Sequence, residues 1–359
     1  MDTKKKWIVL PLLVFASLFP SAPTNAAVPC HEVKLKEQPL WVSSATYLDQ
    51  EQAIVLIDPF RNKLVTFTEK GEAKALPNIQ VKKGVEFEPT EISRTRSGGF
   101  LLEQADGTLT RLDRSLRPVG TVSLQAKNAQ GYRVGSMYQW KVAGDSIVAY
   151  GALYNGKQVE LAFFRVPLEG KSQPPERLMA LADSDFYLIG QSYITAIGDT
   201  AYYVAMGKNP ALYKVAPGRK PVALKAFPDE PELRTRPDFK TRMTGPNSAP
   251  KHFAELESFN VVAGLFAQDG MLYLLVRKAG DWFLYQIDPA KDKILSPEGG
   301  VRLPTTAHHL TVVPSKAEWY FIERGPVEER QQQKIDRMLV VDSAAIAASA
   351  TLPNLCPTK

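Results

Sequence analysis

The chain repeats one pattern six times: an apolar strand, a polar turn, a second apolar strand and then a further short strand. One apolar residue in each copy aligns with its counterparts, and the intervals between these residues are 45, 54, 49, 72 and 54. The aligned residues are Phe67, Leu112, Val166, Val215, Ile287 and Val341. Strand-rich copies at a spacing of about 50 residues are typical of β-propellers, in which small sheets are arranged radially around an axis.

Each copy predicts a sheet of four antiparallel strands. Tight turns such as Gly144-Asp145 and Asp269-Gly270 enter the second strands, because Gly and Asp tolerate the positive φ angles of short hairpins. We expect the second strands at 53–57, 100–102, 147–150, 201–205, 271–276 and 319–322. We expect the fourth strands at 73–76, 119–124, 177–181, 222–227, 301–303 and 349–352. The predicted fold is therefore all-β, a six-bladed β-propeller with four-stranded antiparallel blades.

Each of these sheets is apolar on both faces and has to be covered on both sides, which radial stacking achieves. With 44% hydrophobic and 23% charged residues, the composition excludes a disordered chain and a multi-span membrane protein. A seven-bladed ring lacks a seventh copy, and a pair of β-sandwiches is the other alternative. Each copy contains its own fourth strand, so closure by an N-terminal strand is not needed. Whether residues 31–36 add a strand to the sixth copy stays open.

The first 26 residues have the three parts of a secretory signal peptide. Lys4, Lys5 and Lys6 precede an apolar run at 7–19, and small residues surround a cleavage position after Ala26. The alternative is a membrane anchor, but a spanning helix needs about 20 apolar residues and Pro20 interrupts this run. We expect a mature chain of residues 27–359, secreted or periplasmic, with no membrane span. Cleavage removes three Lys and one Asp, which lowers the net charge from +6 to +4 and gives no evidence for a nucleic-acid partner.

The chain has two cysteines, Cys30 and Cys356, close to the two ends of the mature protein. An exported chain meets an oxidising compartment, where a lone pair of thiols usually forms a disulfide. Such a bond requires the ends of the fold to meet, with Cα atoms about 5–6 Å apart. We expect this disulfide to join the termini and to act as the clasp of the ring. Two unrelated buried thiols are the alternative.

The repeat at 57–71, Ile-Asp-Pro-Phe-Arg-Asn-Lys-Leu-Val-Thr-Phe-Thr-Glu-Lys-Gly, resembles the blades of NHL-repeat proteins. Over nearly the whole mature chain the pattern resembles the superfamily of six-bladed propellers that includes NHL-repeat, strictosidine-synthase-like and paraoxonase-like proteins. A disulfide between the chain ends is similar to what paraoxonases carry. The resemblance is one of architecture.

Paraoxonase-like hydrolases hold calcium in the central tunnel, so the resemblance implies a possible calcium site. Calcium takes six to eight oxygen ligands. The inner strands offer Glu91, Asp185, Glu257 and Asn260 as scattered candidates, without the paired Asn-Asp sites expected of that family. Solvated carboxylates near loop ends are the alternative, and we expect no bound metal.

Motifs that would identify a reaction are absent from the sequence. It has no Gly-x-Ser-x-Gly elbow, no Gly-x-x-x-x-Gly-Lys phosphate loop and no His-Glu-x-x-His zinc helix. His308 and His309 are adjacent at the start of a strand, so their side chains point to opposite faces and at most one lines the tunnel. Either could act as a base, or both are ordinary strand or rim residues. No catalytic residue is assigned.

The least regular segment is the connection between the fourth and fifth blades, residues 228–259. Long connections in compact domains are usually functional or disordered. By propeller topology this connection crosses the face that bears the turns between second and third strands. Basic residues of those turns share that face: Arg61, Lys208, Arg277, Lys278 and Arg324. We expect an anionic ligand or an acidic protein partner to bind Arg234, Arg236, Lys240, Arg242, Lys251 and His252. A solvated loop with scattered charge is the alternative. A second long turn spans residues 324–334. The charged run at 328–338, which overlaps this turn, is the one run that suggests a short helix.

These features favour an exported propeller that acts as a non-catalytic binding module of the cell envelope, since rigid blades present variable loops on one face. The alternative is a calcium-dependent lactonase or esterase with its site at the central tunnel. A structural subunit of an envelope complex is the third possibility.

Overall fold

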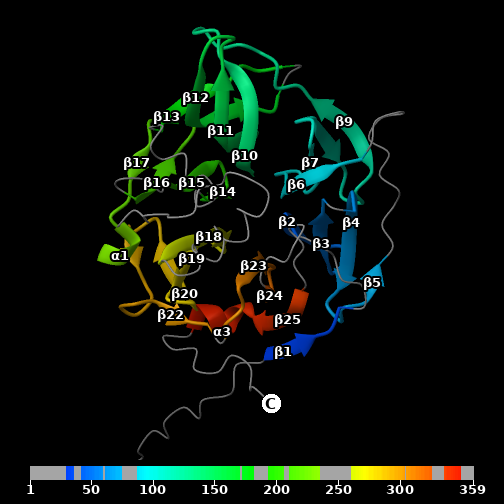
Figure 1. Cartoon of the computed structure of the whole chain (residues 1–359), viewed down its shortest axis with the longest axis vertical. Helices are drawn as coiled ribbons and strands as arrows, with labels where there is room; N and C mark the ends of the chain where they lie inside the picture. Colours follow the sequence, from blue (N-terminus) through cyan, green and yellow to red (C-terminus); the bar gives the residue numbers. More distant parts are fainter. Residues whose placement is uncertain are drawn as a thin grey trace, which may run out of the picture.

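A computed structural model of the chain describes residues 30–35, 42–59, 61–74, 87–169, 172–181, 193–205, 210–234, 260–303, 305–325 and 335–348. Six antiparallel sheets stand in a closed ring around a central axis (Figure 1). This confirms the predicted six-bladed β-propeller with four-stranded blades. The blades follow one another around the ring in chain order.

Blades 1 to 3 occupy the first half of the described chain. Blade 1 consists of β2 (Ser44–Leu48), β3 (Ala53–Asp58), β4 (Lys63–Thr68) and β5 (Ala73–Lys74). Blade 2 consists of β6 (Pro89–Arg94), β7 (Phe100–Gln104), β8 (Leu109–Leu112) and β9 (Pro118–Val122). Blade 3 consists of β10 (Arg133–Ala143), β11 (Ser146–Tyr154), β12 (Val159–Pro167) and β13 (Glu176–Ala180).

Blades 4 to 6 complete the ring. Blade 4 consists of β14 (Tyr193–Ile197), β15 (Thr200–Ala205), β16 (Ala211–Val215) and β17 (Val222–Ala223). Blade 5 consists of β18 (Val261–Gln268), β19 (Met271–Lys278), β20 (Asp281–Asp288) and β21 (Lys293–Ile294), and β20 also pairs with β22 (Val301–Arg302). Blade 6 consists of β23 (His309–Pro314), β24 (Glu318–Arg324), β25 (Ile335–Asp342) and β1 (Cys30–Val33). Two short helices are α1 (Pro231–Arg234) and α3 (Ser343–Ala348).

The core lies between the blades, as the apolar character of both blade faces predicts. The second strands are covered on both faces, and every residue of β3 and β7 is buried. The outermost strands lie at the rim, where β9 and β17 are largely exposed. Large side chains fill the interfaces between neighbouring blades, among them Trp319 between blades 5 and 6 and Tyr320 between blades 6 and 1.

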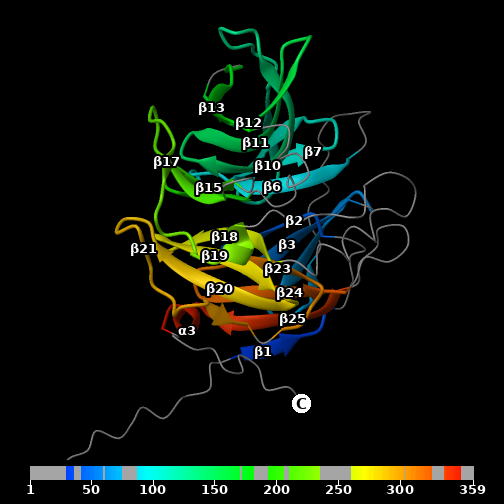
Figure 2. The same ribbon diagram turned by 60° about the vertical axis from the view of Figure 1, so that its left-hand side comes forward.

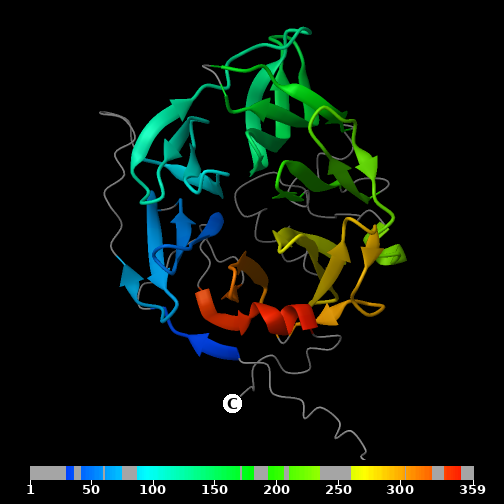
Figure 3. The same ribbon diagram turned by 180° about the vertical axis from the view of Figure 1, so that it is seen from behind.

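The N-terminal strand closes the ring, which corrects the expectation that each copy contains its own fourth strand. β1 pairs with β25 in register from Cys30↔Val341 to Val33↔Met338, and so forms the outer edge of blade 6 (Figure 2). Seen from behind, the blue β1 lies beside the red C-terminal elements (Figure 3). The predicted sixth fourth strand at 349–352 lies outside the described residues. Hydrogen bonds between the two ends of the chain therefore join the last blade to the first segment of the fold.

Two further expectations fall on this part of the chain. The charged run 328–338 is not helical where it is described, because Ile335 to Met338 begin β25 and pair with β24. Burial of Ile335 and Met338 between blades 6 and 1 outweighs the local helix propensity of the run. Cys356 lies outside the described residues, so the Cys30–Cys356 disulfide stays a prediction. Among the described helices, none has the length and apolar character needed to span a membrane.

Candidate functional site

A cavity of about 480 Å³ lies on the axis of the ring. The innermost strand of every blade contributes to its wall, namely β2, β6, β10, β14, β18 and β23. Small residues on these strands, such as Ser44, Ala196 and Ala263, keep the axis open where six strands converge. A concave site built from several rigid elements is where small ligands usually bind.

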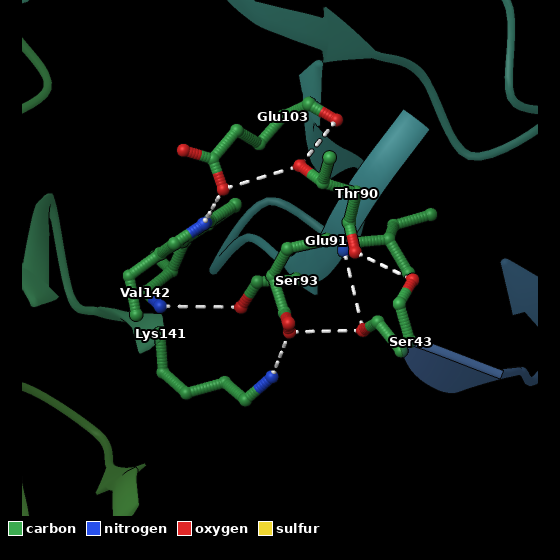
Figure 4. A network of polar contacts seen from close by, with 10 residues as sticks. Ser43, Thr90, Glu91, Ser93, Glu103, Lys141 and Val142 are labelled. Atoms are coloured by element: carbon green, nitrogen blue, oxygen red, sulfur yellow. Dashed lines mark hydrogen bonds and ion pairs between the residues drawn. The ribbon is translucent and has the colours of Figure 1, made fainter. Parts of the chain in front are cut away.

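An ion pair with a hydroxyl beside it forms part of the cavity wall. Lys141 Nζ on β10 lies 2.5 Å from Glu91 Oε1 on β6 (Figure 4). Ser44 on β2 donates a hydrogen bond of 2.9 Å to the same carboxylate oxygen. The side chains of Glu91 and Lys141 are 18% and 38% exposed, so a ligand in the cavity can reach both. Three consecutive blades thus present a carboxylate, an ammonium and a hydroxyl at one point.

Glu103 on β7 lies behind this ion pair and holds the two strands that carry it. Its Oε2 accepts a hydrogen bond of 2.7 Å from Trp140 Nε1 and one of 3.4 Å from Thr90 Oγ1 (Figure 4). Trp140 directly precedes Lys141, and Thr90 directly precedes Glu91. Glu103 therefore positions both members of the pair without lining the cavity itself.

Burial is the main reason that the pKa of the Glu103 carboxyl is raised to about 7. The hydrogen bond from Trp140 lowers this pKa, the negative charge of Glu91 raises it, and the hydrogen bond from Thr90 lowers it. A carboxyl group that is only 8% exposed and titrates near pH 7 is unusual outside functional sites. The charge behind the cavity wall therefore changes in the neutral pH range.

Two serines fix the backbone of neighbouring blades around the ion pair. Ser43 Oγ donates a hydrogen bond of 2.8 Å to the Thr90 carbonyl, and Ser93 Oγ accepts one of 3.2 Å from the Val142 amide (Figure 4). These bonds join blade 1 to blade 2 and blade 2 to blade 3. Side chains held on such paired strands keep a defined geometry, which catalysis and specific binding both require.

We call the face that carries the connection from β17 to β18 the loop-bearing face and the opposite face the hairpin face. Arg277, His308, His309 and Arg324 lie close together on the loop-bearing face, and of these Arg324 lines the cavity. Burial, followed by the charges of Arg324, Arg277 and His308, lowers the pKa of His309 to about 3, so its imidazole is neutral at physiological pH. Burial lowers the pKa of Arg324 to about 10, and its guanidinium stays charged. The Arg324 side chain lines the cavity and donates a hydrogen bond of 3.2 Å to the Val42 carbonyl.

The predicted basic surface is only partly within the described residues. Arg234 is the last residue of α1. The other members of that set, Arg236, Lys240, Arg242, Lys251 and His252, lie outside the described residues. The structure therefore neither assembles this surface nor argues against it.

The described residues do not fit a calcium ion. Of the four candidate ligands, Asp185 and Glu257 lie outside the described residues. Glu91 Oε1 is bound by the Lys141 ammonium and the Ser44 hydroxyl, and Asn260 Oδ1 accepts a hydrogen bond of 3.0 Å from the Ala279 amide. Within the described ranges no three His, Cys, Asp or Glu side chains cluster in a way that could hold a metal. Calcium needs six to eight oxygens, so we derive no chemistry through it.

Sequence reasoning included Glu91 but missed Lys141, Ser44 and Glu103. One signal was available for Glu103, because it follows the apolar run Phe100-Leu-Leu in a strand expected to be buried on both faces. A charged residue in such a strand needs a partner, and this requirement would have drawn attention to the strands beside it. Nothing comparable marks Lys141 among the many surface lysines.

No protein family profile matches the chain. A search of curated proteins also finds no match. Among solved structures, the fold is similar to that of a gluconolactonase from Xanthomonas campestris, with 12% identity, a TM-score of 0.52, and coverage of 90% of this chain and 93% of that chain. It is also similar to a duf4221 family member from Bacteroides vulgatus, with 9% identity, a TM-score of 0.54, and coverage of 88% and 97%. At these identities the likeness shows the fold, and it confirms the resemblance to six-bladed propellers.

Proposed function

We propose that the central cavity is an active site and that the protein hydrolyses a small ester or lactone there. The contact among Glu91, Lys141 and Ser44 inside the cavity carries this proposal, because it brings a proton acceptor and a fixed positive charge to one point. The likeness in fold to a gluconolactonase supports the same reaction class. Fold alone does not transfer function, so the proposal depends on the cavity residues.

Hydrolysis needs a base that takes a proton from water and positive charge where the carbonyl oxygen becomes negative. Glu91 takes the proton as the water oxygen bonds to the carbonyl carbon, and Lys141 Nζ stabilises the oxyanion of the tetrahedral intermediate. The bond from carbon to the alkoxide oxygen then breaks, and Glu91 returns the proton to that oxygen. Ser44 orients the Glu91 carboxylate through its hydrogen bond.

Glu91→Gln and Lys141→Met are each expected to lower kcat/KM by about 100-fold or more, since each removes a group that acts in the transition state. The measurement is acid release in a pH-stat from a panel of five- and six-membered lactones and from p-nitrophenyl acetate. The matched controls are Glu176→Gln on the exposed β13 and Lys293→Met on β21, and both should retain wild-type activity. Wild-type rates in the cavity variants, or turnover that requires added calcium, would contradict the assigned roles.

A non-catalytic binding module is the second candidate function. The observation that favours it is the positive charge of Arg324 in the cavity wall with Arg277 close by, which suits an anionic ligand or an acidic protein partner on the loop-bearing face. Arg234 and the five basic residues that follow in the connection would extend this surface. Saturable, salt-dependent binding of an anionic polysaccharide, with no acid release from any lactone or ester, would favour this candidate over the hydrolase.

We also propose that the protein is exported after cleavage of residues 1–26 and that a Cys30–Cys356 disulfide joins its ends. Cys30 packs against the same apolar cluster as Ile346 of α3, so both described ends of the chain meet at blade 6. The eight residues from 349 to 356 can span at most about 27 Å when extended. The disulfide would then reinforce the closure that β1 makes by hydrogen bonds.

The exported protein is expected to begin at Ala27 and to have a mass about 2 Da below that of its reduced form, because a disulfide removes two hydrogens. Intact-mass measurement with and without reductant tests both points. A Cys30→Ser variant should expose one thiol to alkylation, whereas the wild-type protein should show none until reduced. Two alkylated cysteines in the unreduced exported protein would contradict the disulfide.

A further inference from the structure

We propose that a second hollow, between blades 1 and 2 on the hairpin face, binds the acid group of a small organic anion. This hollow has a volume of about 460 Å³ and is formed by the β2–β3 turn, the β6–β7 turn and the β8–β9 turn. Its charged lining consists of Arg94, Arg96 and Arg114 against Asp49 and Glu51. The proposal goes beyond the hydrolase function and does not depend on it.

The three guanidinium groups are compensated to different degrees. Arg94 forms an ion pair with Asp49. Arg96 lies 3.4 Å from Asp199, but both side chains are more than half exposed, and such a surface pair contributes little. Arg114 has no carboxylate within ion-pair distance anywhere in the described part of the chain. With Asp49 and Glu51 set against the three arginines, the lining of the hollow carries a net charge of +1.

Arg114 is nevertheless held in a defined orientation. Its Nε and Nη2 donate hydrogen bonds of 3.2 and 3.0 Å to the Ser97 carbonyl, which leaves Nη1 for a ligand. Gly98 makes this possible, because a Cβ at that position would lie 2.9 Å from Arg114 Nε. Gly98 also has a φ of +85°, a conformation that favours glycine. The turn is therefore shaped so that a guanidinium rests on it.

Arg94 connects this hollow to the axis of the ring. It lines the central cavity, the hollow between blades 1 and 2, and a third hollow of about 390 Å³ where the axis opens to the hairpin face. Asp49 lines both hollows on the hairpin face. An anion bound at Arg96 and Arg114 would compete with Asp49 for Arg94. It would therefore lie beside the opening of the central cavity on the hairpin face.

The donor set fixes the chemistry of the ligand. Guanidinium groups bind phosphate and carboxylate through paired N–H donors, and these contacts are stronger than neutral hydrogen bonds. The volume of the hollow suits a small ligand, namely one acid group with a short organic body. The shared feature of the ligand is thus a phosphate or carboxylate group.

Isothermal titration calorimetry of the full mature chain tests the site, with inorganic phosphate and acetate as probes at constant ionic strength. The wild-type protein is expected to bind one equivalent of at least one probe, and the stronger probe identifies the acid group. Arg114→Gln should weaken that binding by at least tenfold in Kd. Arg117→Ala is the matched control, because Arg117 belongs to the same β8–β9 turn and does not line the hollow; its Kd should equal that of the wild type.

Equal Kd values for the wild type and Arg114→Gln, or no saturable binding of either probe, would overturn the site. Thermal unfolding of each variant confirms that it is folded, and Arg96→Ala provides a second, more exposed replacement expected to weaken binding several-fold. Hydrolysis of a neutral lactone should be unchanged in Arg114→Gln. Loss of anion binding with retained hydrolysis therefore separates this site from the active site, and failure of one proposal leaves the other standing.

Discussion

Glu103→Gln is expected to abolish one part of the pH dependence of stability. In the wild-type protein, the titration of Glu103 lowers the free energy of unfolding by about 3 kcal/mol between pH 4.5 and pH 7. The folded protein raises the pKa of this carboxyl from 4.5 to about 7, mainly by burial. Between these two values the folded state holds a proton that the unfolded state has released. Stability from this group is thus fully present below pH 4.5 and lost as the pH rises through 7. Glutamine is neutral at every pH and can still accept the Trp140 hydrogen bond.

Chemical denaturation of both proteins at pH 4.5, 6, 7 and 8 measures this effect. Subtracting the wild-type curve from that of Glu103→Gln cancels the contributions of titrating groups that do not interact with Glu103, including His309. The difference should grow with pH and level off above pH 7. The control is Glu176→Gln at an exposed position, for which the difference should stay flat. Parallel curves for Glu103→Gln and the wild type would show that Glu103 has no raised pKa.

Trp319→Ala is expected to lower the free energy of unfolding by about 3 to 5 kcal/mol, the usual cost of removing a large buried aromatic side chain. Trp319 lies on β24 and is 1% exposed. Its ring packs edge-on at 4.7 Å from Tyr273 of blade 5 and at 6.3 Å from Phe266. Its removal leaves a void between two blades, because neither sheet can move inward while the rest of the ring holds it.

Urea denaturation followed by circular dichroism measures this loss. Trp319→Phe keeps an aromatic ring at the interface and should recover a large part of the stability. A variant in which Val119 on the exposed β9 is replaced by alanine provides the surface comparison, with an expected change within about 0.5 kcal/mol. A Trp319→Ala effect as small as that would mean that the blade interfaces contribute little.

The strands were predictable because they depend on short-range pattern. Second strands such as β3 and β19 are continuous apolar runs bounded by turn residues, and these features identify them one copy at a time. The end of the charged run at 328–338 was assigned incorrectly for the same reason. Its local charge pattern suggests a helix, whereas pairing with β24 and burial of Met338 make residues 335–338 part of a strand.

Closure of the ring could not be predicted in the same way. The pairing of β1 with β25 joins residues about 300 positions apart, and no local feature of Cys30 to Val33 specifies that partner. The outer edge of β25 pairs through backbone groups, which every strand has. The arrangement of the folded ring therefore decides which strand pairs with it. The sequence suggested that the ends meet, through its two cysteines, but did not identify the strand that joins them.

Repeat number, blade composition and the apolar faces follow from periodicity and turn chemistry, which are properties of neighbouring residues and need no knowledge of the folded shape. The candidate site is different in kind. Ser44, Glu91 and Lys141 lie on three separate blades and meet because the inner strands converge on one axis. The pKa of Glu103 likewise depends on neighbours that folding places around it. Charge pairing and burial are long-range consequences of packing, so only the assembled ring specifies where the chemistry of this chain lies.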